Sequence, residues 1–191
     1  MKKNSSKNIA MNVIDLEIDA LKILKKSIDK NFENAVNMIL KCQSKIILCG
    51  VGKSGLIAAK IASTLSSVGS PAYSLSANDC LHGDLGSITK RDVLVLISNS
   101  GKSEEIVPII KFANRNKIKL IGIVSKKKSI LYKASDIKIL LPEVKESGLG
   151  VVPTSSTSIQ LAIGDALAIA ALKKRQFSKF DFSRFHPGGN L

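Results

Sequence analysis

Residues 45–55 read KIILCGVGKSG, an apolar run followed at once by a turn of glycine, lysine and serine. The apolar part, 45–49, is typical of a strand buried in a parallel sheet, and the glycines after it are typical of a tight connection into a helix. The chain repeats this arrangement where DVLVLI (92–97) leads into SNSGKS (98–103). Parallel strands bind ligands at their carboxyl ends, and the N–H groups that begin a helix attract phosphate. The two turns together therefore predict one anion pocket.

Strand-like and helix-like patterns alternate along the chain, which predicts an α/β fold with a mainly parallel, five-stranded sheet. Residues 142–153 are expected to form a loop, and the last stretch to end in an irregular segment at 186–189. Between residues 9 and 41 apolar residues recur at steps of three to five, which predicts a long amphipathic helix or a helical pair. We therefore expect a helical segment, 1–44, packed on a single domain, 45–191. The expected strands are 45–49, 71–75, 92–97, 118–124 and 136–141, and the expected later helices are 54–68, 104–115 and 154–174.

The composition argues against several classes of protein. A chain of 191 residues is near the usual size of one domain. The formal net charge of +14 attracts anions of many kinds, but the lysines are scattered and aromatic residues make up only 4% of the chain, which argues against nucleic acid as a partner. The longest apolar run, 159–172, is interrupted by polar residues and is too short to span a bilayer. We expect a core helix there, and no membrane partner.

The cysteines and the amino terminus indicate a cytoplasmic protein. Cys42, Cys49 and Cys80 are odd in number and lack CxxC spacing, which is typical of reduced thiols. The basic amino terminus is followed by acidic residues from Asp15 onward, where a signal peptide needs an unbroken apolar stretch.

Gly50, Gly52 and Gly55 match the GxGxxG pattern of dinucleotide-binding folds, but the match alone is weak evidence. Such a site needs an acidic residue at the end of the second strand, where this chain has Leu75. The turn also mimics the end of a Walker A loop, although Ile47 stands where that motif needs its leading glycine. A dinucleotide site is therefore the weaker interpretation, and a Walker A site is excluded.

Hydroxyl groups gather at three expected helix starts. Their number exceeds what helix capping alone explains, so we expect them to converge on one crevice. Glu146 is a loop carboxylate a few residues before the last group. The hydroxyl-bearing residues are Ser54, Ser98, Ser100 and Ser103, and then Thr154, Ser155, Ser156 and Thr157.

The two histidines of the chain lie in glycine-rich irregular segments, His82 in HGDLG (82–86) and His186 in HPGG (186–189). A histidine in such a segment has no core to fill, so a functional role weighs evenly against a structural one. The pair lacks close ligand spacing, which argues against a zinc site.

From about residue 45 to its end, the chain resembles the sugar isomerase (SIS) domain, and specifically the D-arabinose 5-phosphate isomerases. The resemblance implies a flavodoxin-like, three-layer α/β sandwich that is usually tetrameric. It also implies interconversion of D-ribulose 5-phosphate and D-arabinose 5-phosphate, the precursor of the lipopolysaccharide sugar Kdo. The motifs that carry it are GVGKSG (50–55), HGDLG (82–86), SNSG (98–101) with Ser103 and Glu105, KE (145–146), PTSST (153–157), GDALA (164–168) and HPGG (186–189).

The resemblance places catalytic positions on Lys53, Glu105, Glu146 and His186, with His82 close to the site. We expect a cis-enediol route in which Glu146, with a pKa raised toward neutrality, moves a proton between C1 and C2, and Lys53 stabilises the enediolate oxygen. His186 or His82 opens the cyclic sugar, and Glu105 positions substrate hydroxyls or His186.

The same resemblance implies a set of substrate- and phosphate-binding residues, no cofactor and no metal. His186 is expected to come from a neighbouring subunit of a homo-oligomer, a tetramer with shared active sites. The binding set comprises Gly52, Ser54, His82, Ser98, Asn99, Ser100, Ser103, Thr154, Ser155, Ser156 and Thr157.

The chain departs from the family pattern in four places. Lys102 stands where a glutamate is usual after SNSG, Asp79 replaces a glutamate before HGDLG, and the loop after Glu146 is a residue short. The sequence stops at Leu191, whereas many members continue into a pair of CBS modules. We therefore expect a short form without those modules, and their absence argues against nucleotide regulation.

Two alternatives stay open at this point. One is a non-catalytic module that senses a sugar phosphate, since the same fold serves in transcriptional regulators. The other is an isomerase for a hexulose or heptose phosphate, which the sequence separates less securely.

Overall fold

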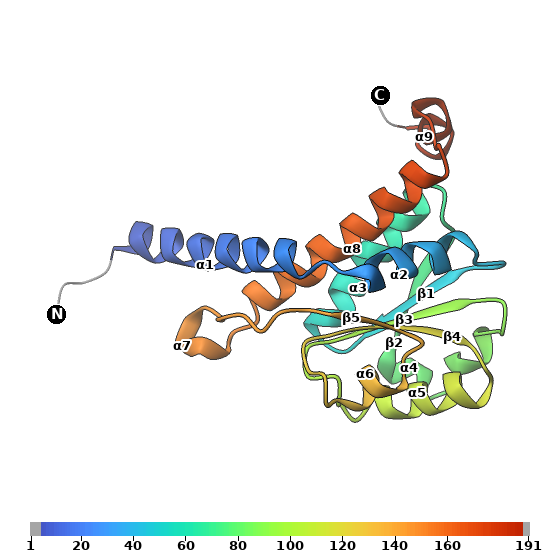
Figure 1. Cartoon of the computed structure of the whole chain (residues 1–191), viewed down its shortest axis with the longest axis horizontal. Helices are drawn as coiled ribbons and strands as arrows, with labels where there is room; N and C mark the ends of the chain where they lie inside the picture. Colours follow the sequence, from blue (N-terminus) through green and yellow to red (C-terminus); the bar gives the residue numbers. More distant parts are fainter. Residues whose placement is uncertain (1–4, 189–191) are drawn as a thin grey trace.

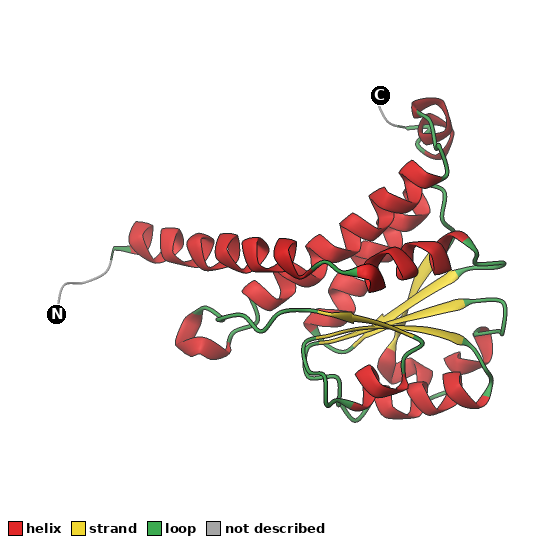
Figure 2. Cartoon of the chain, in the orientation of Figure 1, coloured by secondary structure: helices red, strands yellow, loops and turns green. Residues whose placement is uncertain are grey.

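The computed structural model describes residues 5–188 of the chain (Figure 1). A parallel sheet lies between two layers of helices, and the amino-terminal helix projects from this body (Figures 1 and 2). In chain order the elements are α1 (Ser6–Ser27), α2 (Lys30–Leu40), β1 (Ile46–Gly50), α3 (Lys53–Ser67), β2 (Ala72–Ser76), α4 (Ala77–Cys80), the 3₁₀ turn η1 (Asp84–Ser87), β3 (Val93–Ser98), α5 (Ile106–Arg115), β4 (Lys119–Val124), α6 (Ile130–Ala134), β5 (Ile137–Leu140), α7 (Gly148–Val151), α8 (Ser155–Lys174) and α9 (Lys179–Phe185).

All five strands pair in parallel, in the order β2-β1-β3-β4-β5, which confirms the predicted sheet. The chain runs from β1 outward to β2 on one side and then returns to β3 on the other side of β1. The connections after β1 and β3 therefore leave in opposite directions. An open α/β sheet has its ligand crevice at the carboxyl ends of two such strands.

Helices cover both faces of the sheet, so successive residues of its central strands enter different cores. In β1, Ile46 and Leu48 belong to the core under α2, α3 and α8, whereas Ile47 and Cys49 belong to the core under α4, α5 and α6. A strand buried on both faces is a continuous apolar run rather than an alternating one. The apolar runs at 45–49 and 92–97 predicted this arrangement.

The amino-terminal segment is a helical pair rather than one long helix. The first helix ends at Ser27, and Asp29 caps the second, because its side chain accepts a hydrogen bond of 2.8 Å from the backbone N–H of Asn31. Helix α2 packs against α8 and β5. Helix α1 touches the body near its carboxyl end, where Ala20 and Leu24 are its buried residues.

Several predicted boundaries were wrong because short helices carry little periodic signal. The expected loop at 142–153 contains α7, and α9, which precedes the irregular segment that begins at His186, was not predicted. Helix α5 begins at Ile106 rather than at residue 104. Helices α4 and α6 and the turn η1 were not predicted, since each is five residues or shorter.

Helix α8 corresponds to the apolar run that we expected to be a core helix. It is the one helix of the described residues that is long and apolar enough to cross a membrane by length and composition. Half of that stretch is buried inside the protein, and α8 contacts α1, α2 and α3. These contacts confirm its role as a core helix.

Candidate functional site

The turn after β1 needs its three glycines, two for close backbone packing and one for its backbone conformation. A Cβ on Gly50 would lie 2.8 Å from the carbonyl group of Ser54, and one on Gly55 would lie 2.8 Å from the carbonyl oxygen of Gly50. Gly52 has a φ of +56°, which side-chain-bearing residues rarely adopt. The GxGxxG pattern thus has a steric explanation that requires no dinucleotide. It brings the start of α3 directly against the end of β1.

A pocket of about 440 Å³ opens beside this turn, at the carboxyl edge of the sheet. Val51 and Lys53 reach it from the β1 side, and Asn99 reaches it from the end of β3. It therefore lies at the crevice that the strand order predicts. Of the residues singled out in the sequence, it brings together Lys53, Ser54, Asn99, Glu146, Ser156 and Thr157.

Glu146 lies in this pocket and is held at the amino terminus of α8. Its Oε2 atom accepts hydrogen bonds from the backbone N–H of Thr154 at 2.9 Å and of Ser156 at 3.2 Å, and from the Thr154 hydroxyl at 3.3 Å. These bonds satisfy two of the N–H groups that a helix start leaves unpaired. The helix dipole favours a negative charge at the same position.

These contacts determine the protonation state of Glu146. Burial would raise the pKa of this carboxyl, but the hydrogen bonds from Ser156 and Thr154 outweigh burial and hold the pKa below its ordinary value. The expectation of a pKa near neutrality was therefore wrong for this structure. The carboxylate is ionised at neutral pH, ready to accept a proton.

Lys53 is the first residue of α3, and its side chain is exposed at the pocket. A cation is unfavourable at this end of a helix, because the dipole there is positive. The first turn of α3 also contains no acidic residue that would offset the charge. A residue that opposes the local rule in this way is typical of a functional site.

The hydroxyl groups divide between the pocket and local structure. Ser54 donates a hydrogen bond to Oε1 of Gln160 at 3.2 Å, and Thr157 donates to the carbonyl of Thr154 at 2.8 Å. Within residues 5–188, the buried hydroxyls of Ser147 and Ser155 have no hydrogen-bond partner. Among the expected phosphate ligands, the hydroxyls of Ser54 and Thr157 thus already donate hydrogen bonds within the protein, and the hydroxyl of Ser155 is buried.

Some polar side chains of the loop after β3 form hydrogen bonds within the turn itself. The Ser98 hydroxyl accepts a bond of 3.0 Å from the N–H of Gly101, and the Ser100 hydroxyl accepts one of 3.4 Å from the N–H of Lys102. Asn99 accepts a bond of 2.6 Å from the hydroxyl of Ser125. Of the four predicted residues in this loop, Asn99 lines the pocket, whereas Ser98, Ser100 and Ser103 do not.

The histidines and Glu105 lie outside the pocket. His82 is exposed between α4 and η1, and Glu105 is half-buried just before α5. His186 follows α9, where its ring stacks on Phe182 at 3.9 Å and its Nδ1 lies 2.8 Å from the carbonyl of the same residue. Gly189, the last glycine of HPGG, lies outside the described residues.

His186 is separated from Glu146 by the length of α8. Glu146 contacts the amino terminus of this helix, and α9 follows its carboxyl terminus (Figure 1). The 20 residues of α8 span about 30 Å at 1.5 Å per residue. One chain therefore does not bring the two predicted catalytic residues together.

Sequence reasoning missed Gln160 as a member of the site. Its side chain is buried, accepts the bond from Ser54 and lines the pocket. The signal was present, because Gln160 interrupts an otherwise apolar run. A buried amide in such a run needs hydrogen-bond partners, and one comes from the neighbouring helix α3.

The model of the SIS domain family matches residues 39–170 of the chain. The chain belongs to the SIS domain family. A solved Escherichia coli CFT073 protein in complex with arabinose 5-phosphate is 32% identical to this SIS domain, with a TM-score of 0.93, covering 98% of this chain and 100% of that one. A Listeria monocytogenes structure of a putative sugar-phosphate isomerase is 28% identical, with a TM-score of 0.94 and coverage of 98% and 100%.

Among curated proteins, the arabinose 5-phosphate isomerase KdsD of Francisella tularensis is 46% identical over 188 residues. The alignment covers 96% of this chain and 58% of the relative. The SIS domain described here thus spans somewhat more than half the length of that enzyme.

Proposed function

We propose that this SIS domain is an aldose–ketose isomerase that interconverts D-ribulose 5-phosphate and D-arabinose 5-phosphate. The observation that carries the proposal is the ionised Glu146 in one pocket with Lys53 and several polar side chains, at the carboxyl edge of the sheet. The relative named arabinose 5-phosphate isomerase and the Escherichia coli structure with bound arabinose 5-phosphate support the choice of sugar. The product would serve the biosynthesis of the lipopolysaccharide sugar Kdo.

Glu146 is the base in this proposal. It removes the proton from C2 of the aldose and returns it to C1, so that the reaction passes through a cis-enediol and no net oxidation occurs. Ionisation at neutral pH makes the carboxylate available without a preceding proton loss. The N–H groups of Thr154 and Ser156 fix its orientation before substrate arrives.

Lys53 stabilises the negative charge that develops on the enediolate oxygen. Its exposure at the pocket leaves the ammonium group accessible to a substrate. In this proposal the phosphate is held by Ser54, Asn99, Ser156 and Thr157, which line the pocket. His82 binds substrate near the same edge, and binding energy at the phosphate positions the reacting carbons.

The distance between His186 and Glu146 within one chain supports an oligomer with shared active sites. We propose that Glu105 positions His186 of a neighbouring subunit, which opens the cyclic sugar, in a tetramer of this chain. The large apolar residues that α1 leaves exposed support such an assembly, because exposed apolar surface of this extent commonly marks an interface. They are Ile9, Met11, Ile14, Ile18, Leu21 and Ile23.

The same proposal places the enzyme in the cytoplasm, where its phosphorylated substrate is found. It treats residues 1–44 as a helical segment packed on the SIS domain at 45–191. It requires neither a nucleic acid nor a membrane as partner.

The test is proton NMR of the purified chain with D-ribulose 5-phosphate in D₂O and without added cofactor. Formation of arabinose 5-phosphate with deuterium at C2 is expected. Tight binding without conversion would favour the sensor instead. Conversion of a hexulose or heptose phosphate in preference to the pentose would assign a different isomerase.

A further inference from the structure

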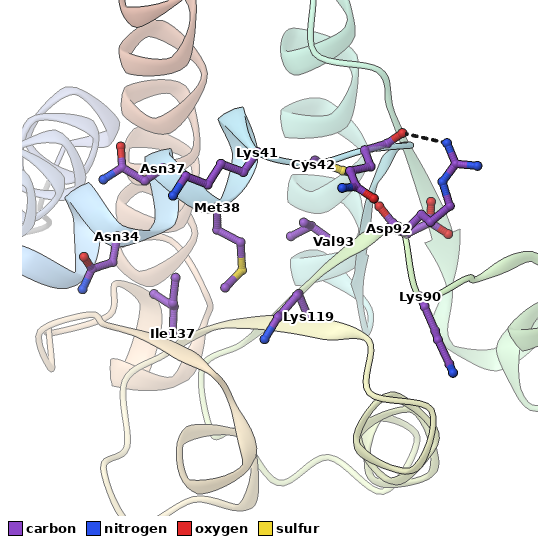
Figure 3. Close-up of a pocket in the computed structure, with 12 residues that line it drawn as sticks. Asn34, Asn37, Met38, Lys41, Cys42, Lys90, Asp92, Val93, Lys119 and Ile137 are labelled. Atoms are coloured by element: carbon purple, nitrogen blue, oxygen red, sulfur yellow. Dashed lines mark hydrogen bonds between the residues drawn. The ribbon is translucent and has the colours of Figure 1, made fainter.

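A second pocket of about 510 Å³ lies at the amino edge of the sheet, opposite the candidate active site (Figure 3). Residues of α2 line one wall, and the residues that begin β3, β4 and β5 line the other. Its size falls in the range of small-molecule sites. The proposed isomerase makes no use of it.

The polar groups of this pocket are mainly cations and hydrogen-bond donors. Figure 3 shows Lys41 and Lys119 with their amines on the two sides of Met38, while Lys90 extends away from them. The Oδ1 atom of Asn37 accepts a bond of 3.3 Å from Lys174. That bond leaves the amide N–H groups of Asn37 as donors and adds another cation beside the pocket.

Among the described residues, the one carboxylate on the pocket wall is already matched. Asp92 is buried and accepts bonds from the Lys45 ammonium at 3.2 Å and from the N–H and hydroxyl of Thr89 at 2.6 and 2.9 Å. Lys45, which does not line the pocket, therefore compensates the charge of Asp92, and the pocket lysines remain available to a ligand. Lys119 also lies 3.9 Å from Asp136, but both side chains are largely exposed, and such a pair is weak.

Met38, Val93 and Ile137 form an apolar part of the pocket, which we call its floor. A ligand that fits both parts has a phosphate for the cations and a flat, weakly polar ring for the floor. Methionine suits such a ring, since its thioether is flexible and polarizable. Asn34 adds an amide that can hydrogen-bond to the edge of a ring.

We propose that this pocket binds a nucleotide, with its phosphates between Lys41 and Lys119 and its base over Met38. The site lies within the residues described here and needs no additional module. Strands β1 and β3 begin at this edge and end at the other, so nucleotide and sugar phosphate bind at opposite ends of the same strands.

The experiment is isothermal titration calorimetry of the full chain with ADP, in the absence and presence of saturating arabinose 5-phosphate. One ADP per chain is expected, with an affinity that the sugar phosphate does not change. The variant Lys41→Gln/Lys119→Gln is expected to bind ADP about tenfold more weakly or worse, because it loses two charge-assisted contacts. The control Lys111→Gln/Lys133→Gln removes the same charge from exposed positions on α5 and α6 and is expected to bind normally.

Inorganic pyrophosphate tests the apolar part of the proposal. ADP is expected to bind more tightly than pyrophosphate, and Met38→Ser is expected to weaken ADP while leaving pyrophosphate unchanged. Absence of ADP binding, competition by arabinose 5-phosphate, or equal loss in the two lysine variants would overturn the site. Equal affinity for ADP and pyrophosphate would overturn the nucleotide assignment. None of these outcomes depends on whether the chain is an isomerase.

Discussion

Glu146 owes its proposed role as a base to its position in the fold. The residue type is common in loops, and loop carboxylates are usually solvated. Here the chain folds back so that the carboxylate meets the first N–H groups of a 20-residue helix. Those groups keep it ionised and limit its motion, two properties that a positioned base requires.

Replacing Glu146 by Gln is expected to lower turnover of D-ribulose 5-phosphate by about two to four orders of magnitude, the usual contribution of a general base. The amide oxygen still accepts from Thr154, so substrate affinity is expected to change little. Steady-state kinetics measure kcat and KM separately. Glu143→Gln is the matched control, because Glu143 is an exposed carboxylate in the same loop that pairs with Lys126. Near-normal turnover by the Glu146 variant would remove its role as base.

Ser156 is expected to help hold the pKa of Glu146 down. Ser156→Ala removes a hydroxyl that stabilises the charged form, so the pKa of Glu146 is expected to rise toward its ordinary value of 4.5. The measurement is a titration of the labelled Glu146 carboxyl carbon by NMR. Ser158→Ala, on the same helix turn, serves as control. An unchanged pKa in the Ser156 variant would show that the backbone N–H groups suffice.

Asp92 is expected to stabilise the fold at neutral pH and to lose this effect in acid. Burial raises its pKa, but bonds from Thr89, Ser44 and Lys45 outweigh burial and hold the pKa below 3.8. A depressed pKa stabilises the folded state above the ordinary value, and the contribution disappears as the pH falls through the folded-state pKa. Asp92→Asn is therefore expected to cost about 1–3 kcal/mol at pH 7.

Urea unfolding at pH 7 and at pH 3 measures this effect. The difference between wild type and the Asp92 variant is expected to shrink at the lower pH. Glu104→Gln, an exposed carboxylate before α5, is expected to leave the free energy of unfolding unchanged at both. A pH-independent cost of Asp92→Asn would mean that packing, rather than charge, explains its burial.

At the scale of elements, the crossing of α3 and α8 depends on one glycine. A Cβ on Gly164 would lie 2.2 Å from Cδ1 and 2.3 Å from Cγ1 of Ile61. Close beside this contact, Lys60 of α3 pairs with Asp165 of α8. The GDALA motif of the sequence thus has a packing role, because its glycine lets the two helices approach.

Gly164→Ala is expected to destabilise the fold by about 1–3 kcal/mol through overpacking. Ile61→Ala alone removes Cδ1 and Cγ1, the two atoms nearest that Cβ, together with Cγ2, and is expected to cost about 2–5 kcal/mol. In the double variant the removed atoms make room for the new methyl group. Thermal or urea unfolding is therefore expected to show that the double variant is more stable than the sum of the two single changes predicts. If the free-energy changes of the two single variants simply add, the contact between residues 164 and 61 is not the source of the destabilisation.

Long, regular elements could be predicted from the sequence, whereas short or irregular ones could not. The central strands β1, β3 and β4 were predictable because residues buried on both faces form apolar runs. Helix α9 was missed although Ser178 and Asp181 form a capping box, a signal available in the sequence. Helix α7 was beyond reach, since Leu149 adopts a φ of +57° that its side chain does not favour.

The candidate site was predictable where it depends on the edge of the sheet. Lys53, Asn99 and the α8 start follow strands or a loop whose ends must meet at that edge. The direction of the shift in the pKa of Glu146 was not predictable, because it depends on which N–H groups the loop reaches. The separation of His186 from Glu146 also depends on how α9 leaves α8, which local patterns do not encode.

At the scale of the whole molecule, one chain is incomplete as the proposed isomerase. Its base lies at one end of α8, and the histidine that the family resemblance assigns to catalysis lies beyond the other end. Phe180 and Phe185 of α9 are exposed beside that histidine, as are the apolar residues of α1. In the proposed oligomer, a neighbouring chain covers these surfaces and brings its own His186 to the pocket.

Shared sites make a specific prediction for mixtures of inactive variants. Glu146→Gln and His186→Gln are each expected to be nearly inactive alone. After the two are unfolded together and refolded, some sites are expected to combine an intact Glu146 from one chain with an intact His186 from another. The mixture is therefore expected to recover a fraction of wild-type turnover in the isomerase assay. Light scattering on Ile14→Glu adds a second measurement, since a charge on α1 is expected to shift the assembly toward smaller species and to lower activity with it. Mixed chains that stay inactive while wild type refolds to full activity would show that each chain supplies its own complete site.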